Sequence, residues 1–251
     1  MKNQTIGVIA AMPEEIAPFL KRVGTYRKES CGGCKLYRFS LGETRIVLVE
    51  SGMGPARAAA AARVLLQEAT PRLVVNYGLG GGVRPGISVG DLVLAQRVVW
   101  LEGNAFRQAA APDREISDRL AGHAAAAGQP MARGTFVTAA AITSKERVSA
   151  LLPPAEPHPV LEMETAAILE VAAEAGVPVI ALRGISDAGD EELGFSLDEF
   201  TDAEFNIKIS RVLATVAQRP RIIPQLIRLA GNSRRAAENL ARLLETALPA
   251  L

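Results

Sequence analysis

Carboxylate side chains stand at three places where expected β-strands end. Glu15 follows the first strand, Glu164 lies beside Glu162 in the segment VLEMET, and Asp187 closes the segment LRGISD. The ends of strands in an open α/β sheet meet in one crevice, so residues far apart in the sequence can come together there. Each carboxylate alone could belong to the first turn of a helix. As a set, with Arg183 nearby, they indicate acid–base chemistry carried by carboxylates.

The residue types that other chemistries need are scarce. Histidine occurs only at His123 and His158, which excludes a metal site built from several histidines. The only cysteines, Cys31 and Cys34, have redox-type or zinc-type spacing, but no second pair exists to complete a tetrahedral zinc site. We interpret them as two incidental thiols, with a redox protein as a distant alternative. No metal is expected, and a reducing, cytoplasmic compartment fits the cysteine content.

Composition and charge exclude further classes of protein. The 251 residues are 49% hydrophobic and 22% charged, which is enough for a full core in one domain. A net charge of +1 argues against a nucleic-acid partner. The charge is unevenly distributed along the chain. From Arg211 onward there are seven arginines and two glutamates, which gives +5 there and −4 in residues 1–210. No apolar stretch is long enough for a transmembrane helix, and the apolar N-terminus is interpreted as a strand rather than a signal peptide.

The elements that must position the carboxylates follow from hydrophobic patterns. Short runs of Val, Ile and Leu alternate with Ala-rich stretches, which is typical of an α/β domain with a buried central sheet. Strands are expected over residues 5–10, 35–40, 45–50, 73–76, 91–100, 136–138 and 179–183. Helices are expected from Pro13 and over residues 55–68, 113–127, 144–151 and 163–175. The remainder is expected to be helical, with breaks at Pro220 and Pro224 and a last helix capped by Ser233.

A glycine cluster, GLGGG at residues 78–82, follows the strand expected at 73–76. It lacks the G-x-G-x-x-G spacing of a dinucleotide fingerprint, and no ribose-binding acid ends a next strand. We interpret it as a tight turn whose glycines let the backbone approach a ligand or another strand.

Five blocks of sequence, taken together, resemble one protein family. They are GVIAAMPEEI, SGMGPARAAAA, NYGLGGGVRPGISVGDLV, LEMETAAI and LRGISDAGDE, in that order over roughly residues 5 to 210. They are similar to the nucleoside phosphorylase/hydrolase superfamily, most of all to its methylthioadenosine/S-adenosylhomocysteine nucleosidases. The resemblance implies an α/β fold, a three-layer α/β/α sandwich with a twisted mixed central sheet, a homodimer or larger homo-oligomer, and no cofactor. Residues 1–218 would form the catalytic domain, and residues 219–251 a basic helical extension of it.

The resemblance also gives each charged group a role in cleaving an N-glycosidic bond, which passes through an oxocarbenium-like state. Asp187 matches the acid that helps protonate the purine at N7, with Ser186 holding it in place. Glu15 matches the carboxylate that orients and deprotonates the attacking water. Arg183 would help fix that water, and Glu164 matches the residue that binds the ribose hydroxyls.

The resemblance places further residues against the substrate. Met163 packs beneath the ribose, and Ile142 and Thr143 flank the base. The set of substrate-binding residues is completed by Met12, Gly78, Leu79, Glu164 and Ser186.

This sequence departs from the family at two places, and both make the pocket more apolar. Leu79 stands where the family usually has a small hydroxyl residue, and Ala139 and Ala140 replace a common Gly-Asp pair. A nucleoside-binding protein with a degenerate site is therefore an alternative. The complete set of carboxylates favours an enzyme.

Hydrolysis is favoured over phosphorolysis. Phosphorolytic relatives carry an arginine on the strand before the glycine cluster, where this sequence has Asn76 and Tyr77, and Arg84 lies beyond the glycines. Without a guanidinium placed to bind an oxyanion, water is the expected nucleophile. The expected function is hydrolysis of a 5′-substituted adenosine with release of adenine, and phosphorolysis is the alternative.

The arginine-bearing tail from Pro220 to Leu251 resembles that of hopanoid-associated members of the superfamily, which act on adenosylhopane. It suggests a large apolar 5′ substituent and a basic helix near an anionic membrane surface. The simpler interpretation, which we prefer, is an amphipathic helix packed on its own subunit or on a partner, because Leu240, Leu244 and Leu248 share a face.

Overall fold

The computed structural model describes residues 4–189, 197–200, 202 and 209–251. Its helices are α1 (Pro13–Val23), α2 (Pro55–Ala69), α3 (Arg114–Ala126), α4 (Lys145–Leu151), α5 (Thr165–Glu174), α6 (Ile209–Gln218) and α7 (Ile223–Ala247). Its strands are β1 (Thr5–Ala10), β2 (Arg27–Cys31), β3 (Cys34–Leu41), β4 (Thr44–Glu50), β5 (Leu73–Gly82), β6 (Leu92–Glu102), β7 (Ala105–Gln108), β8 (Met131–Ala139), β9 (Val160–Glu162) and β10 (Val179–Asp187).

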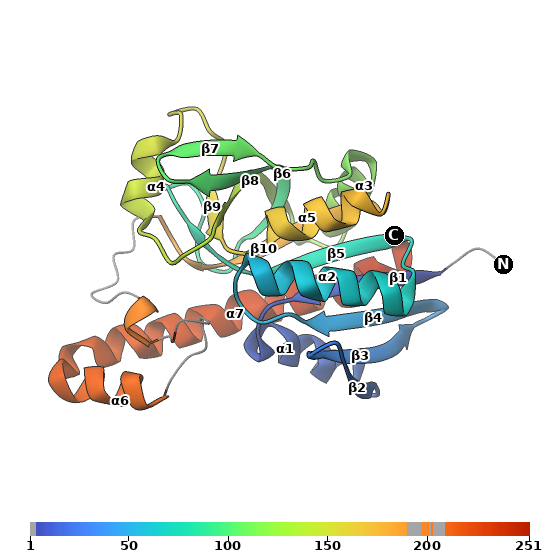
Figure 1. The fold of residues 1–251 in the computed structure, drawn as a ribbon, viewed down its shortest axis with the longest axis horizontal. Helices are drawn as coiled ribbons and strands as arrows, with labels where there is room; N and C mark the ends of the chain where they lie inside the picture. Colours follow the sequence, from blue (N-terminus) through green and yellow to red (C-terminus); the bar gives the residue numbers. More distant parts are fainter. Residues whose placement is uncertain (1–3, 190–196, 201, 203–208) are drawn as a thin grey trace.

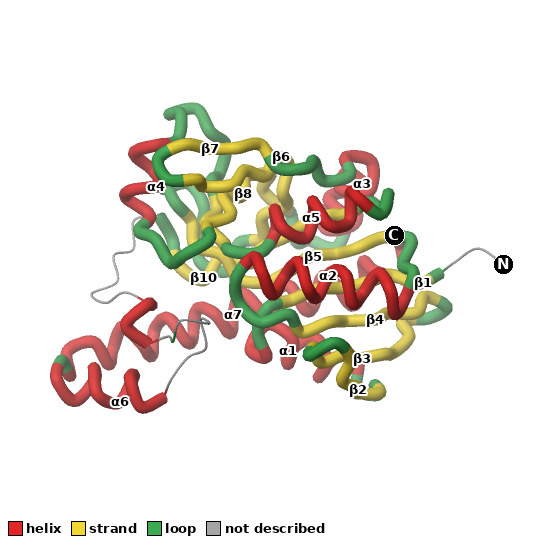
Figure 2. The backbone as a smooth tube through the Cα atoms, in the orientation of Figure 1, coloured by secondary structure: helices red, strands yellow, loops and turns green. Residues whose placement is uncertain are grey.

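The central strands bury side chains on both faces, and this gives the protein three layers (Figures 1 and 2). Along β1, Val8 and Ala10 lie in one hydrophobic core with residues of α1, α3 and α7. Ile9 between them lies in a second core with α2 and α5, and β10 alternates in the same way. Successive strand residues point to opposite faces, so a continuously apolar strand indicates a sheet covered on both sides. The expected three-layer α/β/α sandwich is confirmed.

The mixed sheet closes on itself on one side of β5. β1 pairs in parallel with β4 and β5, and β3 and β2 extend the sheet beyond β4 in antiparallel pairing. Beyond β5, the pairs β5–β10, β10–β6, β6–β8, β8–β9 and β9–β5 form a ring of five strands. Gly81 pairs with both Leu161 and Asp187 in this ring, and Thr138 pairs with Glu162. The ring therefore gathers the ends of four strands in one place.

Two strands of this ring, β5 and β10, are longer than the apolar runs that predicted them. β5 continues through the glycine cluster to Gly82, so the tight turn expected at residues 78–82 is wrong. The neighbouring strands can pack this closely only because glycine has no side chain, since a Cβ at Gly80 would lie 2.5 Å from Val160 Cγ1. β10 likewise continues past Arg183 to Asp187, where a helix was expected. The short strands β2, β7 and β9 were not predicted, since β2 and β7 are polar and largely exposed, and β9 has three residues.

The predicted break of the C-terminal helical segment at Pro220 is confirmed, because α6 ends at Gln218 and α7 begins at Ile223, but the predicted break at Pro224 is wrong. Ser233 lies inside α7 and does not cap it, and Pro224 occupies its first turn, where a missing N–H is tolerated. Leu240 and Leu244, in the distal half, are buried in the core that contains α1 and β10. This confirms that the helix packs on its own subunit. The proximal half and α6 project beyond the sheet (Figure 1).

The structure does not test two of the sequence predictions about this region. The division of the chain at residue 218 stays a prediction. The helical expectation for residues 190–196, 201 and 203–208 lies outside the described residues.

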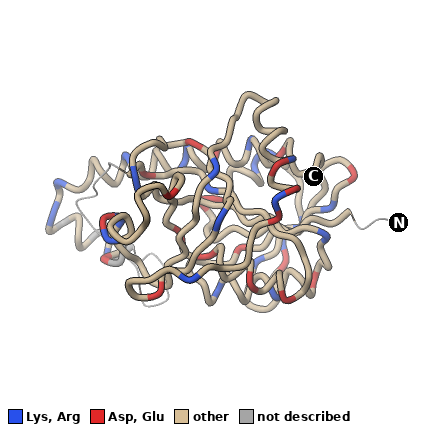
Figure 3. The backbone as a smooth tube through the Cα atoms, turned by 90° about the horizontal axis from the view of Figure 1, so that it is seen from above, with Lys and Arg blue, Asp and Glu red and all other residues tan. Residues whose placement is uncertain are grey.

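The cysteines, the apolar segments and the charged residues that the sequence singled out are considered in turn. Cys31 and Cys34 pair across the turn between β2 and β3, and both are free thiols. Within the described ranges, no helix is long and apolar enough to span a bilayer, and no three potential metal ligands cluster. Basic and acidic side chains are interspersed, with basic residues at the outer end of the α6–α7 projection (Figure 3).

Candidate active site

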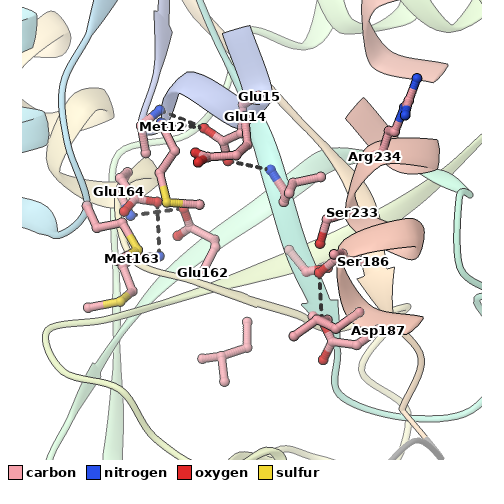
Figure 4. A pocket seen from close by; sticks show the side chains of 18 of the residues that line it. Met12, Glu14, Glu15, Glu162, Met163, Glu164, Ser186, Asp187, Ser233 and Arg234 are labelled. Carbon is pink, nitrogen blue, oxygen red and sulfur yellow. Dashed lines mark hydrogen bonds between the residues drawn. The ribbon is translucent and has the colours of Figure 1, made fainter. Parts of the chain in front are cut away.

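A cavity of about 1640 Å³ opens where β5, β8, β9 and β10 end. Glu15 enters it from α1, Met163 and Glu164 from the turn between β9 and α5, and Ser186 and Asp187 from the end of β10. Met163 and Glu164 lie on one side of the cavity, and Ser186 and Asp187 on another (Figure 4). The structure thus brings together the three carboxylates to which the sequence pointed.

Three backbone N–H groups hold Glu15 at the start of α1. Its Oε2 accepts hydrogen bonds from Ala11 and Met12 at 2.8 and 2.9 Å, and its Oε1 accepts one from Leu79 at 2.7 Å. Gly78 leaves the space for it, because a Cβ there would lie 2.6 Å from Oε1. Burial raises the pKa of Glu15 above its ordinary value, although the N–H donors oppose this shift. A fixed carboxylate with a raised pKa is suited to act as a base.

A buried ion pair lies at the cavity wall, where Glu162 is part of the lining and Arg183 lies behind it. Arg183 Nη2 donates to Glu162 Oε2 at 2.6 Å, and both side chains are 1% exposed. The same Oε2 accepts from the N–H groups of Glu164 and Thr165 at 3.0 and 2.8 Å, so Glu162 caps the first turn of α5. Arg183 also donates to Asn76 Oδ1 at 3.0 Å, which ties β10 to β5. This network fixes the segment that carries Glu164.

Arg183 itself is not part of the cavity lining that the described residues form. Its Nη2 lies 3.8 Å from Glu164 Oε2. The predicted direct contact with water stays a prediction, and the geometry makes Arg183 a group that positions two glutamates.

Glu164 is a buried carboxylate with an unusual titration. The Gly54 N–H donates to its Oε1 at 2.9 Å, and the Met163 N–H to its Oε2 at 3.3 Å. Burial raises the pKa of Glu164 to about 7, and the charge of Glu162 adds to the rise, while Arg183 opposes it. At pH above 7 it is a buried anion, which suits it to accept hydrogen bonds from hydroxyl groups and to stabilise a nearby positive charge.

Among the described residues, side chains rather than backbone N–H groups hold Asp187. Ser186 Oγ donates to its Oδ1 at 2.6 Å. Lys145, the first residue of α4, forms an ion pair with its Oδ2. The same Lys145 Nζ donates to the carbonyl oxygens of Asp187 and Ala188 at 3.3 and 2.8 Å. Asp187 is thus a largely buried carboxylate on the cavity wall with a cation as its immediate partner.

The loop between β8 and α4 closes the cavity beside Asp187. Ala139, Ile142 and Thr143 line it, as do Met12 and Leu79 on other elements. Gly78 does not line the cavity that the described residues enclose, and its role is to make room for Glu15.

Sequence reasoning missed several residues that line the same cavity. Lys145 was expected only as part of a short helix, and no local sequence signal ties it to Asp187. Ser233 and Arg234 reach the cavity from α7, on a segment expected to be an appendage (Figure 4). Glu162 was noted in the sequence, and the only local signal for its structural role is its position three residues before the first residue of α5.

Arg84, which follows the glycine cluster in the sequence, does not take the place of the phosphate-binding arginine. Arg84 donates to Ser149 Oγ at 3.1 Å and to the carbonyl oxygens of Ser149 and Leu152, both at 2.7 Å, so it fastens the end of α4. Asn76 is buried and donates to the Ile9 carbonyl at 3.2 Å. Neither side chain lines the cavity within the part of the chain that is described.

The fold and the site define a class of protein: an α/β sandwich with carboxylates on facing sides of a pocket at the ends of its strands. The chain belongs to the phosphorylase superfamily, whose family model matches residues 5–218. A 5′-methylthioadenosine/S-adenosylhomocysteine nucleosidase from Actinobacillus succinogenes is 30% identical over 226 residues, which cover 85% of this chain and 98% of that protein.

Solved structures share the fold over nearly the whole chain. Futalosine hydrolase of Helicobacter pylori matches with a TM-score of 0.75 at 19% identity, over 99% of both chains. A 5′-methylthioadenosine/S-adenosylhomocysteine nucleosidase from Neisseria meningitidis, in complex with methylthio-immucillin-A, matches with a TM-score of 0.75 at 23% identity, over 99% of this chain and 100% of that one. The predicted family and fold class are therefore confirmed.

Proposed function

We propose that this protein is a nucleosidase that hydrolyses the N-glycosidic bond of a 5′-substituted adenosine and releases adenine. The observation that carries the proposal is the convergence of Glu15, Glu164 and Asp187 on one cavity. The relative from Actinobacillus succinogenes, which bears the name of such an enzyme and aligns over almost its full length, supports it.

The geometry supports a different catalytic role for each of the three carboxylates. Glu15 orients a water molecule and takes a proton from it as the oxygen meets the anomeric carbon. Glu164 accepts hydrogen bonds from the ribose hydroxyls, and its negative charge stabilises the oxocarbenium-like sugar. Asp187 lies across the cavity, where it gives a proton to N7 of the departing purine. Met163 packs beneath the ribose, and Ile142 and Thr143 flank the base.

Water is the proposed nucleophile, and the positions of two residues support this. Arg84 is committed to the end of α4, and Asn76 is committed to the buried network around Arg183. A phosphate ion at the glycine cluster would therefore not receive a bidentate contact from Arg84, the kind of contact that favours phosphate recognition. Phosphorolysis remains the alternative that the experiment below distinguishes.

The cavity continues beyond the carboxylates toward an apolar surface. Phe200, Val212, Leu226 and Leu229, from the segment before α6, from α6 and from α7, line this outer part. It lies on the side that α7 covers, and apolar walls favour an apolar 5′ substituent through burial of its surface. This observation supports a second candidate substrate with a large apolar 5′ group, of the adenosylhopane type.

One substrate panel tests these proposals. The protein is incubated with methylthioadenosine, S-adenosylhomocysteine, adenosine, inosine, futalosine and a 5′-alkylated adenosine, each with and without phosphate. Release of adenine without phosphate is the expected result. Release only with phosphate would show a phosphorylase, and a clear preference for the alkylated substrate would identify the second candidate. Binding without release from any substrate would show a nucleoside-binding protein and refute the enzyme.

We further propose that the protein acts in the cytoplasm as a homodimer or larger homo-oligomer. The free thiols of Cys31 and Cys34 support a reducing compartment. The exposed Ile223 and Ile227 of α7, 39% and 68% exposed, support a contact of this helix with a second subunit. Sedimentation of the protein alone gives the oligomer size. Co-sedimentation with anionic vesicles tests the alternative that the basic helix meets a membrane.

A further inference from the structure

Lys145 is a largely buried lysine at the catalytic end of β10. Its ammonium contacts Asp187 Oδ2, the Asp187 carbonyl and the Ala188 carbonyl, which gives each of its three N–H bonds an acceptor. The side chains of Lys145 and Asp187 are only 15% and 12% exposed. An ordinary surface lysine keeps its ammonium in water, so this placement is specific.

The fold makes room for this lysine. A Cβ on Gly81 of β5 would lie 3.1 Å from Lys145 Cε and 3.0 Å from Asp187 Oδ2. A side chain at that position would press on both partners of the ion pair. The glycine cluster therefore serves Lys145 as well as the neighbouring strands.

Helix α4 does not depend on Lys145 for its own anchorage. Arg84 fastens its C-terminal end through Ser149 and Leu152. Arg147 donates to the Gly103 carbonyl at 2.8 Å, which ties the helix to the β6–β7 turn. A contact needed only to dock α4 would duplicate these bonds, so the position of Lys145 calls for a role at Asp187.

The hydrogen bonds around Asp187 define that role. Ser186 donates to Oδ1 and Lys145 donates to Oδ2, so both oxygens act as acceptors, as in an ionised carboxylate. A carboxylate whose two oxygens both accept hydrogen bonds has no proton of its own to give. The departing purine needs a proton to leave as a neutral base. Among the described residues that contact the Asp187 carboxylate, the Lys145 ammonium is the cationic donor.

We propose that Lys145 holds the proton that Asp187 passes to the leaving base, so that the two side chains act as one acid. This inference rests on the proposed hydrolysis. As the C1′–N9 bond breaks, its electron pair moves into the purine, and N7 takes a proton from Asp187. Asp187 takes a proton from Lys145 Nζ, which becomes a neutral amine. The attacking water gives a proton to Glu15, and solvent then restores the protons on Lys145 and removes the one on Glu15.

The test compares two leaving groups. Wild type, Lys145→Ala and Lys145→Arg are assayed on an adenine nucleoside that the wild type cleaves, and on a 4-nitrophenyl riboside with the same 5′ substituent. Nitrophenolate leaves without being protonated, so its release does not need an acid. Turnover of the nitrophenyl riboside also shows that a variant is folded. Lys28→Ala, on the exposed edge strand β2, is the matched control for loss of a lysine.

We expect Lys145→Ala to lower kcat on the adenine nucleoside by about 10²-fold or more and on the nitrophenyl riboside by less than about 3-fold. Added ethylamine should restore adenine release in proportion to its concentration. Lys145→Arg should stay slow, because a guanidinium keeps the charge but does not give up its proton. Lys28→Ala should match the wild type on both substrates.

Three results would overturn the inference while leaving the proposed function intact. Equal losses on both substrates would show a structural role. Faster adenine release by Lys145→Ala would show that the lysine blocks the acid. Wild-type activity in Lys145→Arg would show that a fixed charge is sufficient. A wild type that cleaves no nucleoside but binds one would instead refute the proposed function, and the inference with it.

Discussion

The two ends of the active site are built in different ways. At the sugar end, Glu15 and Glu164 accept hydrogen bonds from backbone N–H groups, and a fully buried ion pair between Glu162 and Arg183 supports the turn that carries Glu164. At the base end, Asp187 is held by the side chains of its neighbour and of a short helix. The first end is fixed by the fold itself, whereas the second depends on rotatable side chains.

This difference matches the different tasks of the two ends. A carboxylate that must meet a developing positive charge gains from a fixed position, because no reorganisation is then needed during the reaction. A group that must pass a proton benefits from a partner that can change its own protonation and still keep contact. The raised pKa values of Glu15 and Glu164 belong to the fixed, buried end.

The largest effect is expected when the acid of the base end is removed. Asp187→Asn should lower kcat for adenine release by up to about 10⁴-fold, equal to about 5 kcal/mol of transition-state stabilisation. The fold should survive, because Asn keeps the size of Asp and can accept the Ser186 hydrogen bond. Steady-state kinetics and thermal unfolding measure the two effects. Unchanged turnover would refute the assignment of the acid.

The second effect concerns stability and should be larger at the sugar end. Arg183→Met leaves the buried Glu162 carboxylate without its cation, so the free energy of unfolding should fall by about 3–5 kcal/mol in urea titrations. Lys145→Ala should lower it by less, about 1–2 kcal/mol, because the Asp187 side chain is 12% exposed and keeps the Ser186 hydrogen bond, whereas the Glu162 side chain is 1% exposed.

A double variant controls for the size of the arginine. Arg183→Met combined with Glu162→Gln removes both charges and should recover part of the loss. If the double variant is no more stable than Arg183→Met alone, lost packing rather than an unpaired charge explains the destabilisation.

The third prediction uses the raised pKa of Glu164. Its ionised form binds the ribose hydroxyls in the proposed mechanism, so kcat/KM of the wild type should fall as pH decreases through about 7. Glu164→Gln should lower kcat/KM by about 10²-fold at pH 8 and should lose this part of the pH profile. A profile that is unchanged in the variant would contradict the role of Glu164.

The same group makes an opposite prediction for stability. A carboxyl whose pKa rises from 4.5 to about 7 on folding binds its proton more tightly in the folded state. Its contribution to the free energy of unfolding is therefore present at low pH and is lost as pH rises from about 4.5 to 7. Glu164→Gln removes this loss, so its stability relative to the wild type should improve from pH 5 to pH 8, by about 1–3 kcal/mol. Equal differences at both pH values would contradict burial of the charge.

The smallest effects are expected for two glycines of β5, of which Gly78 contacts the sugar end of the active site and Gly81 the base end. A Cβ at Gly78 would lie 2.6 Å from Oε1 of Glu15, whose carboxylate is held by three backbone N–H groups. At Gly81 a Cβ would meet the ends of two movable side chains at 3.0 and 3.1 Å. Gly78→Ala should lower kcat/KM by roughly 10-fold and Gly81→Ala by less, because the flexible ion pair can shift. Gly122→Ala, in α3 with open space around it, is the control and should stabilise the protein by up to about 1 kcal/mol. A larger loss in Gly81→Ala would reverse the comparison.

Much of the framework was accessible from local patterns. The apolar run at residues 5–10 and the helix over 113–127 could be predicted from hydrophobic patterns alone. The continuation of β5 through GLGGG was missed because glycine carries no apolar signal, and the neighbouring strands, not the residue itself, keep that backbone extended. The start of a last helix was wrongly predicted at Ser233, because serine is a common N-cap residue and the local sequence does not show that α7 continues through it.

The sequence by itself determined the fold class and the family of this protein, together with the carboxylates that carry its proposed chemistry. Hydrophobic periodicity and the motifs around Glu15, Glu164 and Asp187 are local, so they can be read one segment at a time. Only the tertiary structure decided that Glu162 and Arg183 pair inside the protein and that Lys145 lies on Asp187. Those pairings join residues on separate elements that meet only when five strands close into a ring, because burial and charge pairing depend on neighbours in space.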